Sequence, residues 1–332
     1  MRLTCGNAWL DVASVGAMIT QAQLCVNGQA IRPFFDNPWQ HDPRPMDTLT
    51  RHLGAEWPCV PFGVPEPPDN LPSSWLVAED TATWNKHAHG YGAHNQWKLT
   101  RQDNQTLSAD ISYPDASPIA RVRRGVTLAS ERDIHLRLEV SARASVTLPL
   151  GVHPVFSLVD AKVGAVTIEL PGDESAWTFP IDVEPGQSRL QPDQRGCPLS
   201  ALRTSSGDVT DARKLPFPGK SEDLILLPNA AGSISLLRPE SGYRATLRWN
   251  ADDLPACLLW ISNRGRDYAP WDGRVSAVGI EPIAGAFDLG VAHSASLNTP
   301  LALSNISTAV QIKQDETWHT EYSISLEGLS SV

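Results

Sequence analysis

The sequence alternates apolar and polar side chains over many short stretches, and this period of two limits its possible folds more than any other feature. A period of two matches a β-strand with one buried face, whereas the buried face of a helix repeats about every 3.6 residues. The clearest alternating stretches are residues 134–140, 233–237, 244–249 and 322–327. Turn signals that combine glycine with Asn, Asp or Ser occur at 27–28, 206–208, 240–242 and 272–273. The pattern predicts an all-β chain.

Proline and glycine are spread along the whole chain, which leaves little room for long helices. The 332 residues contain 27 Pro and 23 Gly, and no composition break or fixed-period repeat divides them. Residues 33–72 and 185–218 look irregular, and the first segment is rich in Pro and Trp. Long ordered loops in a β-sandwich usually cover a binding face. We therefore expect a single β-sandwich domain spanning residues 1–332, with elaborated loops.

The charge and cysteine content restrict the partners and the compartment. A formal net charge of -10 repels phosphate backbones and anionic lipid, so nucleic acid and membrane surfaces are poor partners. Arg121 and Arg123 would share the solvated face of one strand. The five cysteines have no short spacing, which favours reduced thiols over disulfides or a metal knuckle. No signal peptide or 18-residue apolar run is present, so we expect a cytoplasmic protein. We expect it to be a monomer or a homodimer. The 11 Trp residues slightly favour a carbohydrate ligand.

A segment between residues 87 and 97 gathers groups suited to a polar ligand. It contains His87, His89 and His94, two glycines that allow close backbone approach, and Trp97 as an apolar surface. Three nearby histidines could hold a metal, but no Asp, Glu or Cys lies at ligand spacing. We expect no metal here, and solvent-facing histidines in a polar loop are the simpler alternative.

His153 and Glu281 are the candidates for proton transfer. His153 follows the apolar run 146–150 and precedes Pro154, which stiffens the backbone at a strand end. The ordinary pKa of histidine lies near neutral pH, as proton transfer requires. Glu281 sits in the apolar stretch 278–283, where it must be paired or have a raised pKa. A structural histidine, and a buried ion pair of Glu281 with an arginine such as Arg264 or Arg274, are the alternatives.

Two further segments carry polar residues beside apolar strands. Glu222 and Asp223 precede the apolar run 224–227, where they either bind a ligand or simply end a strand at the surface. Residues 260–265 bring Trp260, Asn263 and Arg264 together close to a strand. These residues are candidates for ligand binding.

The order of these segments resembles the aldose 1-epimerase (galactose mutarotase) family. That family carries a His-Gly…Gly…Trp segment, a His followed closely by an aromatic residue at a strand end, an acidic residue heading a strand, and a Glu near the C-terminal end. The matching positions are His89-Gly90, Gly92 and Trp97, then His153 with Phe156, then Glu222 or Asp223, and last Glu281. The order holds over about residues 50 to 290. The forms around His153, Glu281 and residues 57–63 are similar to the family's less characterised bacterial branches.

The resemblance implies a large antiparallel β-sandwich and a cofactor-free exchange between the α and β anomers of a free aldose. It makes Glu281 the base that takes the proton of the anomeric hydroxyl, and His153 the acid that protonates the ring oxygen. His89 would hydrogen-bond the sugar, and Glu222 or Asp223 would hold a ring hydroxyl. Trp97, Trp260, Asn263 and Arg264 remain candidates for the rest of the sugar site.

One departure from the family pattern concerns an arginine. The family usually has an Asn-Arg pair shortly after the proline-rich segment, and its Arg contacts the substrate, whereas here Phe62-Gly63 is followed by Val64-Pro65. Arg51, Arg264 and Arg266 are the possible substitutes. A sugar-binding protein without turnover, and a hydrolase or lyase with two carboxylates on a related sandwich, are the alternative functions.

Overall fold

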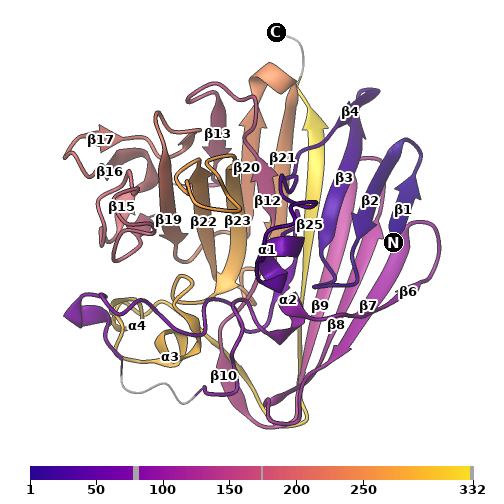
Figure 1. The fold of residues 1–332 in the computed structure, drawn as a ribbon, viewed down its shortest axis with the longest axis horizontal. Coiled ribbons are helices and arrows are strands. Elements are labelled where there is room, and N and C mark those ends of the chain that lie inside the picture. The colour runs from indigo at the N-terminus through magenta and orange to yellow at the C-terminus, as the bar shows by residue number, and fades with distance from the viewer. Residues whose placement is uncertain (78–81, 173–174, 330–332) are drawn as a thin grey trace.

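A computed structural model describes residues 1–77, 82–172 and 175–329 of the chain (Figure 1). Strands dominate it, and every helix is short. The helices are α1 (Thr48–His52), α2 (Tyr91–His94), α3 (Gly290–Ala295) and α4 (Pro300–Leu303), with 3-10 turns η1 (Ser73–Trp75), η2 (Leu199–Ala201) and η3 (Pro239–Ser241). Within the described ranges, none of these helices has the length and apolar character that crossing a membrane requires. The predicted all-β chain is confirmed.

The largest sheet has nine antiparallel strands in the order β18-β13-β20-β21-β25-β9-β8-β7-β6. Its strands are β6 (Lys98–Arg101), β7 (Thr106–Ser112), β8 (Ile119–Leu128), β9 (Asp133–Ala142), β13 (Val166–Glu169), β18 (Lys214–Leu215), β20 (Ser233–Arg238), β21 (Tyr243–Trp249) and β25 (Thr317–Gly328). All four stretches with the clearest alternation lie in this sheet. Burial alternates along β9, because one face of the sheet packs inward and the other meets solvent.

The second sheet has eight antiparallel strands in the order β15-β14-β19-β22-β23-β11-β5, with β12 also pairing with β23. Its strands are β5 (Pro58–Cys59), β11 (Leu150–Val152), β12 (Val155–Ser157), β14 (Ser175–Thr178), β15 (Cys197–Pro198), β19 (Ser221–Leu227), β22 (Ala256–Asn263) and β23 (Ser276–Ala284). Every residue of β19, β22 and β23 is buried. These three neighbouring strands are therefore covered on both faces.

The remaining strands form small sheets. The N-terminal four-stranded sheet β1-β2-β3-β4 lies in front of the nine-stranded sheet in Figure 1. The small sheets contain β1 (Arg2–Cys5), β2 (Ala8–Val12), β3 (Ile19–Val26) and β4 (Gln29–Ile31), and the two-stranded ribbons β10 (Val146–Leu148) with β24 (Val310–Ile312) and β16 (Leu202–Arg203) with β17 (Val209–Thr210).

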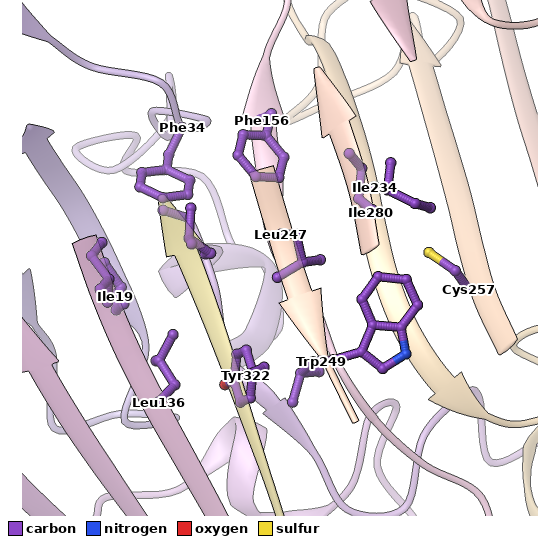
Figure 2. Close-up of a cluster of buried hydrophobic side chains, with 14 of the residues drawn as sticks. Ile19, Phe34, Leu136, Phe156, Ile234, Leu247, Trp249, Cys257, Ile280 and Tyr322 are labelled. Carbon is purple, nitrogen blue, oxygen red and sulfur yellow. The ribbon is translucent and has the colours of Figure 1, made fainter. Parts of the chain in front are cut away.

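The main hydrophobic core fills the space between the nine-stranded sheet on one side and the eight-stranded and N-terminal four-stranded sheets on the other. Figure 2 shows part of it, including Ile19 from β3, Leu136 and Tyr322 from the nine-stranded sheet, and Ile280 from β23. Sheet-on-sheet packing of this kind is the β-sandwich architecture. The predicted antiparallel sandwich is thus confirmed.

A second core covers the outer face of the eight-stranded sheet. It includes Trp39 and Trp57 from the proline-rich segment 33–72, Trp75 just after it, Leu258 and Trp260 from β22, and Phe287 beyond β23. The segment predicted to cover a binding face therefore lies on the face opposite the main core, and its tryptophans are buried there.

A buried ion pair joins the N-terminal part of the chain to the nine-stranded sheet. Arg124 on β8 and Glu56 form a fully buried salt bridge. The hydroxyl of Tyr322 donates to Glu56 Oε1 at 2.5 Å, and Arg124 donates to the carbonyl of Ala17 at 3.0 Å. The neighbouring Arg123 points the other way and pairs with Asp110 at the surface, as the alternation of a strand requires.

Replacing Arg124 by Met should strongly destabilise the protein, because Glu56 would remain buried without its cation. The expected loss in the free energy of unfolding is about 3–5 kcal/mol, measured by urea denaturation. The matched control, Arg123→Met, removes an exposed pair on the same strand and should cost less than about 1 kcal/mol. Equal losses in the two variants would contradict this account.

Candidate active site

His153 and Glu281 face each other across two strands of the eight-stranded sheet. Gly151 on β11 pairs with Ile283 on β23, and Val155 on β12 pairs with Gly279. The register of both pairs places His153, between β11 and β12, opposite Glu281. His153 Nε2 lies 3.3 Å from Glu281 Oε1. The sheet itself thus positions the two groups predicted to transfer protons.

The Glu281 side chain folds back over a glycine of its own strand. A Cβ atom on Gly279 would lie 2.2 Å from Glu281 Oε1 and 3.2 Å from the Cβ of Trp260. No side chain fits at that separation, so the carboxyl group can adopt this position only because residue 279 lacks a Cβ. Glycine inside a strand often marks such a close approach.

The segment 57–63 crosses the site and holds both histidines by backbone hydrogen bonds. The amide of His153 donates to the carbonyl of Trp57 at 2.9 Å, and the amide of His89 donates to the carbonyl of Gly63 at 2.8 Å. A Cβ on Gly90 would lie 1.8 Å from the carbonyl oxygen of Val60. The glycine after His89 therefore allows the loop to pass directly against this segment.

Aromatic rings surround the histidines. Trp57 stacks on His153 with ring centroids 4.0 Å apart, and Phe62 meets the edge of His89 at 5.1 Å. The two imidazole rings are 5.2 Å apart and nearly perpendicular, and Trp260 lies 6.0 Å from His153. His89, His153 and Glu281 therefore converge with tryptophan beside them, in an environment of low polarity.

Burial pushes the pKa values of the pair in opposite directions. Glu281 is only 1% exposed, and loss of water, with a smaller contribution from the charge of Asp288, raises its pKa well above the ordinary value. Loss of water, with a smaller contribution from the charge of the nearby His89, lowers the pKa of His153 well below its ordinary value. Both shifts favour the neutral forms. Burial therefore favours a neutral carboxyl group beside a neutral imidazole, a form of the pair that holds one titratable proton.

His89 is neutral as well, and several polar atoms of the site lack partners. Burial, with a smaller effect of His94, lowers the pKa of His89 to about 4. Within the described residues, the Nδ1 atoms of His89 and His153 and Oε1 of Glu281 are buried without a hydrogen bond. Buried polar atoms are rarely left unsatisfied in proteins, so the arrangement suits a polar ligand.

Glu222 and Asp223 lie inside β19, which begins at Ser221, rather than ahead of it as the sequence suggested. Strand alternation therefore sends their side chains to opposite faces. Glu222 faces the site side and accepts from Ser262 Oγ at 2.7 Å and from the Trp260 indole at 3.3 Å. Asp223 faces the other way, where it accepts from the amide of Leu190 at 2.9 Å and burial raises its pKa to about 6.

Three other predicted residues are not brought to the histidine pair. Trp97 is buried in the main core, where its indole donates to the carbonyl of Gly92 at 2.9 Å. Asn263 donates its amide to the carbonyl of Phe217 at 2.8 Å and so fastens a loop. Arg264 is exposed at the surface with a left-handed φ of 61°.

The structure bears on two alternatives named above, an arginine as the ion-pair partner of Glu281 and a metal site at the histidines of residues 87–94. Arg274 donates to the carbonyls of Pro38 at 3.1 Å and Pro270 at 2.6 Å, so the ion-pair contact of Glu281 is His153 and not Arg264 or Arg274. The rings of His87 and His94 lie 4.9 Å apart. In the described part of the chain, no group of three or more His, Cys, Asp or Glu side chains could hold a metal ion.

Arg266 and Asp288 border the site but could not be singled out from the sequence. The sequence indicated Arg266 only as one of three possible substitutes for the arginine that the family usually has. Asp288 lies shortly after Glu281 in a segment that carries no motif. The amide of Val64 donates to the carbonyl of Asp288 at 2.7 Å and so holds Asp288 against the segment that follows Gly63. Burial raises the pKa of Asp288 to about 6. The only sequence signal was the motif 57–63, which anchors this loop.

The chain shares its fold with solved structures of aldose 1-epimerase and galactose mutarotase type. A proposed aldose 1-epimerase from Escherichia coli K12 is 16% identical with a TM-score of 0.66, covering 99% of this chain and 98% of its own. A galactose mutarotase related enzyme from Lactobacillus acidophilus is 12% identical with a TM-score of 0.63, covering 100% and 98%. An aldose epimerase homologue from C. elegans is 10% identical with a TM-score of 0.61, covering 99% of both chains. No protein-family model and no curated protein sequence matches the chain.

Replacing Glu281 by Gln should stabilise the protein at neutral and higher pH. In the wild type, the folded state keeps the Glu281 proton at pH values where the unfolded chain has lost it, so the free energy of unfolding falls as pH rises above the ordinary pKa. The glutamine amide does not titrate, so the variant does not lose stability in this way as the pH rises. We expect a gain on the order of 1 kcal/mol at pH 7, shrinking toward pH 4, in urea denaturation. Glu327→Gln, at an exposed position, is the control, and a destabilised Glu281→Gln at pH 7 would contradict the burial argument.

Proposed function

We propose that the chain is an aldose 1-epimerase-like isomerase that interconverts the α and β anomers of a free sugar. The observation that carries the proposal is the buried pair of His153 and Glu281, whose Nε2 and Oε1 atoms lie 3.3 Å apart. The fold shared with aldose 1-epimerase-like structures supports it, but fold alone does not fix chemistry. The residues of the pair carry the argument.

Opening a hemiacetal ring requires two proton movements. The proton on O1 must leave, and O5 must gain a proton as the C1–O5 bond breaks. When the titratable proton of the pair resides on His153, Glu281 is the carboxylate that accepts the O1 proton and His153 is the imidazolium that protonates O5. Rotation about C1–C2 then presents the other carbonyl face, and the reversed steps close the ring. Each general acid or base step contributes roughly 10²–10⁴-fold.

The surroundings of the pair suit this reaction. Neutral His89 can hydrogen-bond the sugar without adding a second cation beside His153. Trp260 offers an apolar ring beside the pair, and such rings pack against the C–H faces of sugars. The reaction needs neither a redox group nor a nucleotide. A hydrolase, in contrast, would need a second carboxylate free to act on the sugar, and the Glu222 carboxylate is already occupied by protein donors.

The decisive experiment is mutarotation of freshly dissolved α-D-glucose or α-D-galactose, followed by optical rotation or anomeric NMR signals. The protein should accelerate the change, and Glu281→Gln should lower kcat/KM by about 10²–10⁴-fold because the amide cannot accept a proton. The matched control is Glu240→Gln at an exposed salt bridge, which should retain full activity. Failure to accelerate any aldose in a panel would reject the isomerase, and retained sugar binding would then indicate a sugar-binding protein.

The rate should depend on pH with a bell shape. At low pH the pair gains a second proton and loses its base, and at high pH it loses its only proton and thus its acid. Because burial and His89 lower the pKa of His153, the acidic limb of kcat/KM should lie below the ordinary histidine value of about 6.5. Stopped-flow polarimetry, corrected for the buffer-catalysed rate, measures the profile. An acidic limb above pH 7 would contradict the lowered pKa.

A further inference from the structure

Arg266 lies one side chain away from the proton-transfer pair. Its guanidinium carbon is 4.5 Å from the ring centroid of Trp271 and 5.6 Å from that of Trp260. The same Trp260 ring lies 6.0 Å from His153. The Arg266 side chain packs against both indoles and is still 19% exposed, so a ligand can reach it.

Two carboxylates neutralise Arg266 and leave an excess of negative charge. Arg266 Nε lies 2.9 Å from Glu184 Oε1 and 3.6 Å from Glu222 Oε2. Within the described ranges, no other Lys or Arg lies within ion-pair distance of either carboxylate. With both carboxyl groups ionised, the cluster Glu184–Arg266–Glu222 carries one more negative than positive charge. Burial raises the pKa of Glu222, and Arg266 and the hydrogen bonds to the carboxylate oppose that rise. Burial raises the pKa of Asp288 to about 6, an effect that Arg266 partly opposes, so this carboxyl group adds further negative charge at neutral pH.

Glu222 is a holding group rather than a free acceptor. Its Oε1 accepts from Ser262 Oγ at 2.7 Å and from the amide of Gly265 at 3.2 Å, and its Oε2 accepts from the Trp260 indole at 3.3 Å. Arg266 Nε lies 3.6 Å from Oε2 without a hydrogen bond, so three of the about four acceptor positions of the carboxylate are taken by protein donors. A Cβ on Gly265 would lie 2.6 Å from the Glu222 Cγ, so the backbone closes around this side chain.

The closest carboxylate approaches to Arg266 are both at Nε. The two terminal nitrogens, each with two N–H groups, are the positions at which a ligand would bond Arg266. Sugar hydroxyls can accept these bonds without bringing charge. A phosphate or carboxylate would bond them too, but it would also meet the excess negative charge in a site of low dielectric, where like charges repel strongly.

We propose that Arg266 is a specificity-determining residue that binds hydroxyl groups of an uncharged sugar, and that the cluster Glu184–Arg266–Glu222 excludes sugars bearing a phosphate or carboxylate. This inference rests on the proposed function, because it assigns a substrate class to the same site. Glu222 is then a positioning residue that acts through Arg266 and Trp260.

The test compares kcat/KM for mutarotation of glucose, glucose 6-phosphate and glucuronate, each corrected for its uncatalysed rate. The wild type should favour glucose over either anion by at least about 10-fold, because the charge of the anion would lie close to one uncompensated negative charge of the cluster. Glu184→Gln removes the excess charge and should reduce that preference at least about fivefold. Glu240→Gln, a surface carboxylate distant in the fold and paired with Lys162, should leave the preference unchanged.

Two results would overturn the inference. One is equal or faster turnover of glucose 6-phosphate or glucuronate, and the other is an unchanged preference in Glu184→Gln. Equilibrium binding of the same three sugars by ligand-observed NMR keeps the test separate from catalysis. If no sugar is turned over but glucose binds and the anions do not, the proposed isomerase fails while the charge selection stands.

The role of Glu222 has its own readout. Glu222→Gln should lower the preference for glucose over the anions as Glu184→Gln does, because it also removes one negative charge, and it should raise KM more than it lowers kcat. Glu222→Asp, which keeps the charge, should keep the preference. A Glu222→Gln variant that loses glucose binding while its preference stays at the wild-type value would show a direct ligand and refute the positioning role.

Discussion

The coverage of β19, β22 and β23 on both faces is the constraint on which the rest of the structure depends. One face of these strands forms the sandwich core, and the other is closed by the proline-rich segment and its tryptophans. A carboxyl group placed on such a strand loses its water. Glu281 therefore takes a raised pKa and the facing His153 a lowered one, so the pKa values of the two groups are shifted toward each other.

The site is assembled by backbone contacts more than by side-chain contacts. The segment 57–63 binds the amides of both His153 and His89, and glycines at 90 and 279 let a carbonyl and a carboxyl group approach where a Cβ would collide. Such contacts cost little conformational freedom once the sheet has formed. They also make the position of the proton-transfer pair a property of sheet register, since Gly151 and Val155 flank His153 in pairing with β23.

Sequence patterns predicted the strands well and the neighbours within the site only partly. Alternation identified β9 and β25 because one solvated face leaves a period of two, and the strand end before His153 followed from an apolar run and a proline. The acidic pair shows where this reasoning stops. Glu222 and Asp223 are adjacent in sequence, yet a strand directs adjacent side chains to opposite faces, so the register of β19 decided which of them meets Trp260.

The sequence by itself determined the all-β class, the buried setting of Glu281 and the stiffened position of His153, because periodicity and local backbone chemistry are written in neighbouring residues. Only the tertiary structure decided that Trp97 belongs to the main core, and that Arg266, not Arg264, packs against Trp260 and Trp271. These outcomes depend on contacts between residues far apart in the chain. The charge environment of a site is a sum over such contacts, and no local pattern specifies it.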